Sequence, residues 1–158
     1  MSFDIQINNQ TGVFDQLDHD IMLDGVGSPI ILTGQNKLIQ DIQKILFTTK
    51  NYFYTTYGTN IESLVGTNIG VDKTKSQLAE QVTNSLVYLQ YLQNQQSQYQ
   101  KVNANEIIGT IDSITVNYLP EIQTQNTSPS DVFTFRVAIS ITTAAQKPIV
   151  VTNNLSLA

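Results

Sequence analysis

The stretch VFTFRVAISIT, residues 132–142, decides the fold class of this chain. Apolar and polar side chains alternate along it, and in an extended chain successive side chains point to opposite faces. Clean alternation of this kind is typical of an antiparallel strand that buries one face and exposes the other. The face that we expect to be buried carries Phe133, Phe135, Val137, Ile139 and Ile141.

Extended segments lie on both sides of this strand in the sequence. The apolar side chains of residues 106–119 change their spacing from three to two near residue 112, which predicts a strand with a bulge or bend. Lys147-Pro148 ends the central strand, and residues 149–152 begin a short extended segment. We therefore expect a C-terminal β-hairpin and an extended terminal strand within a tail of residues 147–158, and we expect the chain to fold without the residues from 149 onward.

Two helices precede these strands. Residues 35–47 place apolar side chains at helical spacing, which predicts an amphipathic helix. A longer helix is expected to begin near residue 72 or 74, because Thr74 and Gln77 have the spacing of a capping box. Its buried stripe is expected to consist of Leu78, Val82, Leu86 and Leu89, widened by Val87, Tyr88, Tyr91 and Leu92.

The order of these elements predicts an α+β fold, in which a small antiparallel or mixed sheet packs against the two main helices. The chain has 158 residues, which suits a single domain over residues 1–158. Within that domain, the Gln-rich residues 93–105 are interpreted as a polar helix end or a linker.

The composition excludes several classes of function. Without cysteine and with one histidine, the chain cannot use a thiol nucleophile or any site that needs two histidines. Eight basic residues against thirteen acidic ones give a net charge of −5, so the basic surface of a nucleic-acid-binding protein is missing. No apolar run is long enough to span a membrane, and the opening residues carry no secretion signal, so we expect synthesis in the cytoplasm.

The surface is expected to be polar but weakly charged. Charged residues make up 13% of the chain, and Gln, Asn and Thr take their place. Isolated monomers usually carry more charge for solubility. The composition therefore fits a protein that works inside an assembly, although biased codon usage explains it equally well.

No constellation of residues predicts catalysis, a metal site or a cofactor. His19 stands between Asp18 and Asp20 beside no nucleophile motif, and we interpret it as an exposed turn residue. The acidic run Asp15, Asp18, Asp20 and Asp24 lacks the spacing of a calcium loop, and Gly25-Val26-Gly27 lacks the third glycine of a dinucleotide fingerprint. The four glutamates, at positions 62, 80, 106 and 121, form no recognisable glycosidase pair.

Two stretches are candidates for binding a protein partner. Tyr52, Phe53, Tyr54 and Tyr57 crowd into six positions before Gly58, and they either divide between core and loop or form an interface hot spot. Ile149, Val150 and Val151 are apolar on both faces of any strand that they form. That strand either pairs within its own sheet or takes part in β-augmentation with a neighbouring chain.

Residues 34–66, GQNKLIQDIQKILFTTKNYFYTTYGTNIESLVG, resemble the baseplate wedge proteins of contractile-tailed phages, also called sheath initiators, which have relatives in type VI secretion baseplates. The family pattern is matched by Gln40-Asp41, Leu46-Phe47-Thr48, Tyr57-Gly58 and Leu64. Many members also carry Gly-Glu and Pro-Arg pairs around the turn, where this chain has Lys50-Asn51 and Thr55-Thr56. The charged residues with which many family members hold neighbouring wedge proteins are therefore missing here.

The resemblance implies a structural role without catalysis or cofactor. It implies partners among the tail sheath protein and the other baseplate wedge proteins, a place in the virion at the tail baseplate, and several copies, expected to be six, around the tail tube. It also implies strand edges offered to the first sheath ring. The same family has carried a lysozyme label, which gives a second hypothesis of a peptidoglycan hydrolase using Glu62 and Glu106. A third is a ligand-binding module of a secretion or tail apparatus.

Overall fold

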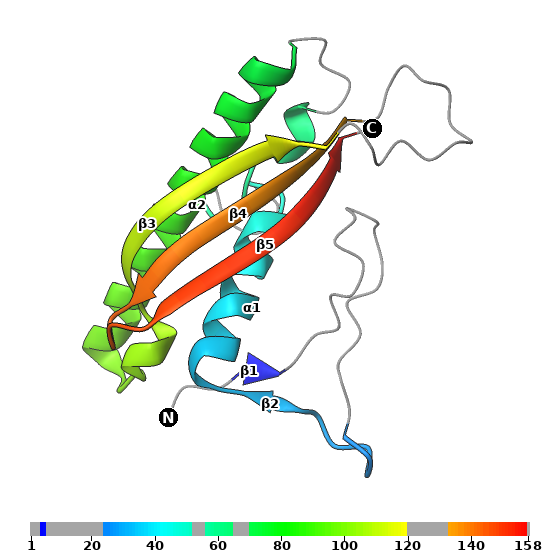
Figure 1. Ribbon diagram of the computed structural model, residues 1–158. Helices are drawn as coiled ribbons and strands as arrows, with labels where there is room; N and C mark the ends of the chain where they lie inside the picture. Colours follow the sequence, from blue (N-terminus) through cyan, green and yellow to red (C-terminus); the bar gives the residue numbers. More distant parts are fainter. Residues whose placement is uncertain (1–3, 6–23, 52–55, 65–69, 120–132, 158) are drawn as a thin grey trace.

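The structure is a computed structural model that describes residues 4–5, 24–51, 56–64, 70–119 and 133–157. Two helices lie behind a three-stranded antiparallel sheet, in two layers (Figure 1). A second, two-stranded sheet joins β1 (Asp4–Ile5) to β2 (Ile31–Leu32) just before the first helix. The fold is therefore α+β, as the sequence predicts.

The first helix, α1 (Gly34–Phe47), forms where the apolar side chains have helical spacing. Leu38, Ile42 and Ile45 have no exposed surface and face the sheet and the second helix. The helix is followed by a short 3-10 helix, η1 (Ile61–Leu64). Ile61 and Leu64 of η1 complete this side of the core.

The second helix, α2 (Val71–Tyr99), begins one residue before the first of the two predicted positions and has no side-chain cap. Thr74 lies inside its first turn, where the hydroxyl donates a hydrogen bond to the carbonyl oxygen of Gly70, so the expected capping box does not form. The predicted stripe of Leu78, Val82, Leu86 and Leu89 is buried, but Val87 and Tyr91 are more than half exposed. The polar residues 93–99 continue the helix, and a short 3-10 helix, η2 (Ala104–Glu106), leads into the sheet.

The three strands β3 (Ile108–Tyr118), β4 (Phe133–Thr143) and β5 (Pro148–Leu157) follow one another in the sheet, with β4 in the centre. The buried face predicted for β4 is confirmed, because Phe135, Val137, Ile139 and Ile141 are all buried. On the opposite face Arg136 is exposed, but Thr134 is buried. The expected bulge in β3 is also present, as shifts in the β3–β4 register between Ile108 and Thr110 and between Ile111 and Ser113.

The last strand is longer than the short segment that the sequence suggests. β5 pairs with β4 without interruption, from Thr142 opposite Pro148 to Phe133 opposite Leu157. Ile149, Val151, Leu155 and Leu157 enter the core. Most of the stretch expected as a tail is therefore a full strand of the domain's own sheet.

The core fills the space between the sheet and the two helices (Figure 1). It contains buried side chains from both helices, from η1 and from all three strands of the larger sheet. No helix in the described part of the chain combines the length and the apolar character that a membrane span requires.

Candidate protein interface

Within the described residues, β5 forms one edge of the larger sheet and β3 forms the other. β4 is the neighbour of β5 on one side, and no strand among the described residues pairs with β5 on the other side. The outward backbone groups of an edge strand are a template for pairing with another chain. This edge is therefore the first candidate for a binding surface.

The hydrogen-bond pattern of the hairpin determines which residues present their backbone at this edge. Thr143 donates its backbone N–H to the carbonyl oxygen of Lys147, so these two residues form a hydrogen-bonded pair. Hydrogen-bonded pairs alternate along an antiparallel ladder. The backbone groups of Val150, Thr152 and Asn154 therefore point away from β4. Pro148 has the same phase, and proline is tolerated there because its missing N–H would have faced outward.

The predicted apolar site Ile149, Val150 and Val151 is split by the strand. The Val150 side chain is 66% exposed on the outer face, whereas Ile149 and Val151 are buried in the core. Sequence reasoning missed Thr152 and Asn154, which share the outward phase of Val150 and are exposed. In a strand every second residue faces the same way, so counting in steps of two from Pro148 would have identified Thr152 and Asn154 as outward-facing.

The outer face of the sheet is nearly uncharged. Asp112 and Arg136 are the only charged residues within the three strands. The Asp112 carboxylate accepts hydrogen bonds from the hydroxyls of Thr110 and Thr142, and Arg136 lies 3.4 Å from the Asn154 side-chain oxygen. The central positions Ala138 and Ser140 carry small side chains.

The aromatic turn gives a different result. Tyr52, Phe53 and Tyr54 lie outside the described residues, and Tyr57 is half-buried against the core. Gly58 is buried, and its carbonyl oxygen accepts a hydrogen bond from the Ser85 hydroxyl on α2 at 2.9 Å. Gly58 therefore fastens the turn to the helices instead of presenting a binding surface.

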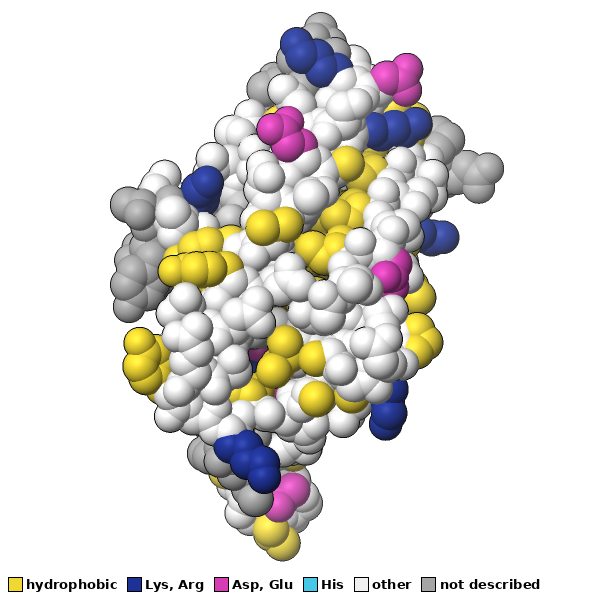
Figure 2. All heavy atoms as spheres, turned by 90° about the vertical axis from the view of Figure 1, so that its left-hand side faces the viewer, with side chains coloured by type: hydrophobic (Ala, Val, Ile, Leu, Met, Phe, Trp, Pro, Cys, Tyr) yellow, Lys and Arg dark blue, Asp and Glu magenta, His cyan; other side chains and the backbone are white. Residues whose placement is uncertain are grey.

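A second exposed apolar patch lies on α2. Val87 and Tyr91 are 52% and 55% exposed, and the Tyr91 ring stacks on that of Tyr88 with 6.1 Å between centroids. Figure 2 shows the side of the molecule that carries α2 and β3, where uncharged surface predominates and charged side chains are scattered. The sequence assigned Val87 and Tyr91 to the buried stripe, so this patch was also missed.

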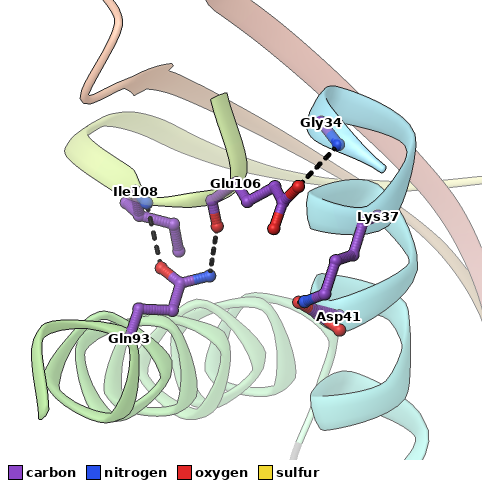
Figure 3. A network of polar contacts seen from close by, with 6 residues as sticks. All are labelled: Gly34, Lys37, Asp41, Gln93, Glu106 and Ile108. Carbon is purple, nitrogen blue, oxygen red and sulfur yellow. Dashed lines mark hydrogen bonds and ion pairs between the residues drawn. The ribbon is translucent and has the colours of Figure 1, made fainter. Parts of the chain in front are cut away.

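Among the residues that the structure describes, the most buried carboxylate belongs to a structural junction. Glu106 is 2% exposed, and its Oε1 accepts a hydrogen bond from the backbone N–H of Gly34 at the start of α1. The Gln93 side chain on α2 donates to the Glu106 carbonyl oxygen and accepts from the Ile108 N–H, each at 2.9 Å (Figure 3). Nearby on α1, Lys37 and Asp41 form an ion pair at 2.6 Å. The junction ties α1, α2 and β3 together.

Gln93→Leu should destabilise the domain by about 2–4 kcal/mol, because the change leaves one buried carbonyl and one buried N–H without partners. Gln90→Leu is the matched control, since Gln90 also donates two hydrogen bonds to β3 but is only half-buried. Water can replace its bonds, so its loss should be about 1 kcal/mol or less. Urea unfolding measures both, and equal losses would contradict the junction's importance.

The two glutamates of the hydrolase hypothesis do not come together. Asn60, two residues before Glu62, bonds to Gln81 of α2, whereas the Glu106 backbone bonds to Gln93. Gln81 and Gln93 are roughly 12 residues apart along α2, which places these two anchor points about 18 Å apart. The two carboxylates of a glycosidase lie only roughly 5–10 Å apart. Glu62 instead accepts a hydrogen bond from the Thr49 hydroxyl.

The structure shows no metal cluster among the described residues. Asp15, Asp18, Asp20 and His19 lie outside the described part. The Asp24 carboxylate accepts hydrogen bonds from the backbone N–H groups of Val26 and Ser28 and so closes the Gly25-Val26-Gly27 turn. Comparison of the chain with family models, with curated proteins and with solved structures finds no match.

Proposed function

We propose that this chain is a non-catalytic structural component of a contractile phage tail baseplate, which docks on wedge proteins and templates tail sheath assembly by β-strand exchange. The observation that carries the proposal is the open edge of β5, with the outward backbone groups of Val150, Thr152 and Asn154. The resemblance of residues 34–66 to baseplate wedge proteins supplies the setting.

The way β5 is held favours one direction of exchange. Its inward side chains Ile149, Val151, Leu155 and Leu157 are buried, so the strand cannot leave its own sheet without opening the core. β5 therefore accepts a strand from a neighbour, and it does so as a rigid template. A preformed edge lowers the cost of ordering on binding to that of the incoming segment.

The strength of such a contact suits an assembly better than an isolated pair. A strand of about five residues gains only about 0.5–1.5 kcal/mol net per hydrogen bond, so a single contact is weak. Six copies fixed around a tail tube would act together, and linked binding events can raise avidity about 10²–10⁴-fold. Sheath would then assemble on the baseplate and not on free copies.

Thr152→Pro tests the proposal, because proline removes an outward N–H at a position that makes no ladder bond with β4. We expect phage particles that carry this variant to contain the protein in their baseplates but to lack sheath. Electron microscopy and mass spectrometry of purified particles give the two readouts. Thr152→Val, which keeps the N–H, should give normal tails, and sheathed Thr152→Pro particles would contradict strand acceptance at this edge.

A further inference from the structure

One side chain of β5 does not fit the environment of a single copy. Asn153 points to the core face of the strand between Val151 and Leu155 and is 7% exposed. Its Nδ2 is buried without any hydrogen-bond partner. A buried donor without an acceptor is destabilising and rare in folded proteins. Rotation of the Asn153 side chain toward the outer side of β5 would let an acceptor from another molecule relieve it.

The positions of the outward-facing backbone groups of β5 restrict the registers in which a second copy could pair with this edge. The free backbone groups belong to the even-numbered residues from 150 to 156, so an antiparallel pairing of two β5 strands must join even positions to even positions. Each symmetric pairing is then defined by the residue that lies on the two-fold axis. Axes at 151, 152 and 154 place Asn153 opposite Ile149, Val151 and Leu155, respectively. Only the axis at residue 153 places Asn153 opposite itself.

The pairing centred on Asn153 also matches the remaining side chains. On the core face, Val151 lies opposite Leu155 of the second copy and Ile149 lies opposite Leu157, so apolar side chains meet apolar ones. On the outer face, Thr152 lies opposite Asn154. β5 contains no charged residue, so the pairing brings no like charges together. It also lacks the charged side chains that prevent edge strands from pairing in many proteins. The two strands exchange roughly eight backbone hydrogen bonds in this register.

We propose that two free copies of this chain pair through their β5 edges about a two-fold axis at Asn153, which joins the two sheets into one of six strands. Opposed residues of a non-hydrogen-bonded pair have their side chains close together, so each Asn153 amide, once rotated toward the edge, can donate to the side-chain oxygen of the other. The paired asparagines select the register, as a buried asparagine does in coiled coils.

This inference rests on the same free edge as the proposed function and adds its regulation. In the dimer, both β5 edges are occupied, so a free copy cannot accept a strand from another protein. The contact consists of one strand per copy and is small compared with a standard interface, so the dimer is weak and depends on concentration. A ring of partner strands on an assembly displaces it.

A cysteine at residue 153 tests the register directly, because the chain has no cysteine of its own. Opposed residues of a non-hydrogen-bonded pair lie about 4.5 Å apart between Cα atoms, which is within the range of a disulfide. We expect purified Asn153→Cys protein to form a disulfide dimer under mild oxidation on a non-reducing gel. Val151→Cys is the matched control, since residue 151 lies on the same buried face as residue 153. In the proposed register the two residues 151 of the dimer are about 13 Å apart along the strands, too far for a disulfide.

Sedimentation velocity of the unsubstituted chain gives a second readout that does not depend on the cysteine variants. We expect a monomer that shifts toward dimer as concentration rises, and a monomer at all concentrations for Thr152→Pro. Cross-linking at 151 and not at 153, or an unsubstituted chain that stays monomeric at every concentration, overturns the inference. Both measurements use the purified chain without other tail proteins. A negative result in them would therefore contradict the dimer without contradicting the proposed function, which the sheath experiment on particles tests separately.

Discussion

A chain that ends at Lys147 will not fold into a stable domain. The change removes the buried side chains of Ile149, Val151, Leu155 and Leu157 and every hydrogen bond between β4 and β5. Each buried aliphatic side chain contributes about 1.5–3 kcal/mol, so four of them contribute about as much as the whole stability of a typical domain. Circular dichroism during urea titration should show no cooperative unfolding transition.

The full-length variant Val150→Thr is the matched control, because it changes the exposed face of the same strand. It should unfold cooperatively, within about 0.5 kcal/mol of the unsubstituted chain. A cooperative transition in the shortened chain would show that β5 lies outside the folding unit. The structure therefore overturns the expectation that residues from 149 onward can be removed from a folded protein, and point changes at the edge are the appropriate tests of binding.

Gly58→Ala is expected to destabilise the domain by about 3 kcal/mol or more, because it combines backbone strain with a steric clash. Gly58 has a φ of +102°, and a Cβ atom there would lie 2.2 Å from the backbone oxygen of Thr48. That oxygen accepts the hydrogen bond from the Thr59 N–H and cannot move without loss of this bond. Thermal and urea unfolding give the measurement.

Gly70→Ala separates the two causes. Gly70 also has a positive φ, of +85°, but no atom lies within 4 Å of the position of its missing Cβ. The change at residue 70 should therefore cost only the strain of the backbone, about 1–3 kcal/mol. Equal losses for the two variants would mean that the close approach of Gly58 to Thr48 has no energetic weight.

The sequence predicts the elements whose side chains follow a clear period. The alternation of β4 and the apolar stripe of α1 arise from burial on one face, and both elements form within two residues of the predicted bounds. The start of α2 was predicted to within one residue, but its capping was not, because Thr74 bonds to the backbone four residues earlier and no side chain caps the helix. The exposure of Val87 and Tyr91 depends on the position of β3, which local spacing does not reveal.

The sequence indicates β5 as a candidate interface but not which of its residues face outward. Val150 belongs to it, but the polar residues from Thr152 to Asn154 do not resemble a strand by composition. Their extended structure follows from the length of β4, which supplies a pairing partner for every residue of β5. The partners of Glu106 and Gln93 could not be predicted either, because their hydrogen bonds join elements that are distant in the sequence.

The nearly uncharged outer face of the sheet has a kinetic consequence. One carboxylate and one guanidinium produce little long-range attraction, so partners that approach this surface meet it by unassisted diffusion. Association without electrostatic steering proceeds at about 10⁵–10⁶ M⁻¹s⁻¹ and responds little to ionic strength. The affinity of any partner that binds this face would therefore depend on its dissociation rate and on the number of copies bound together, not on its association rate.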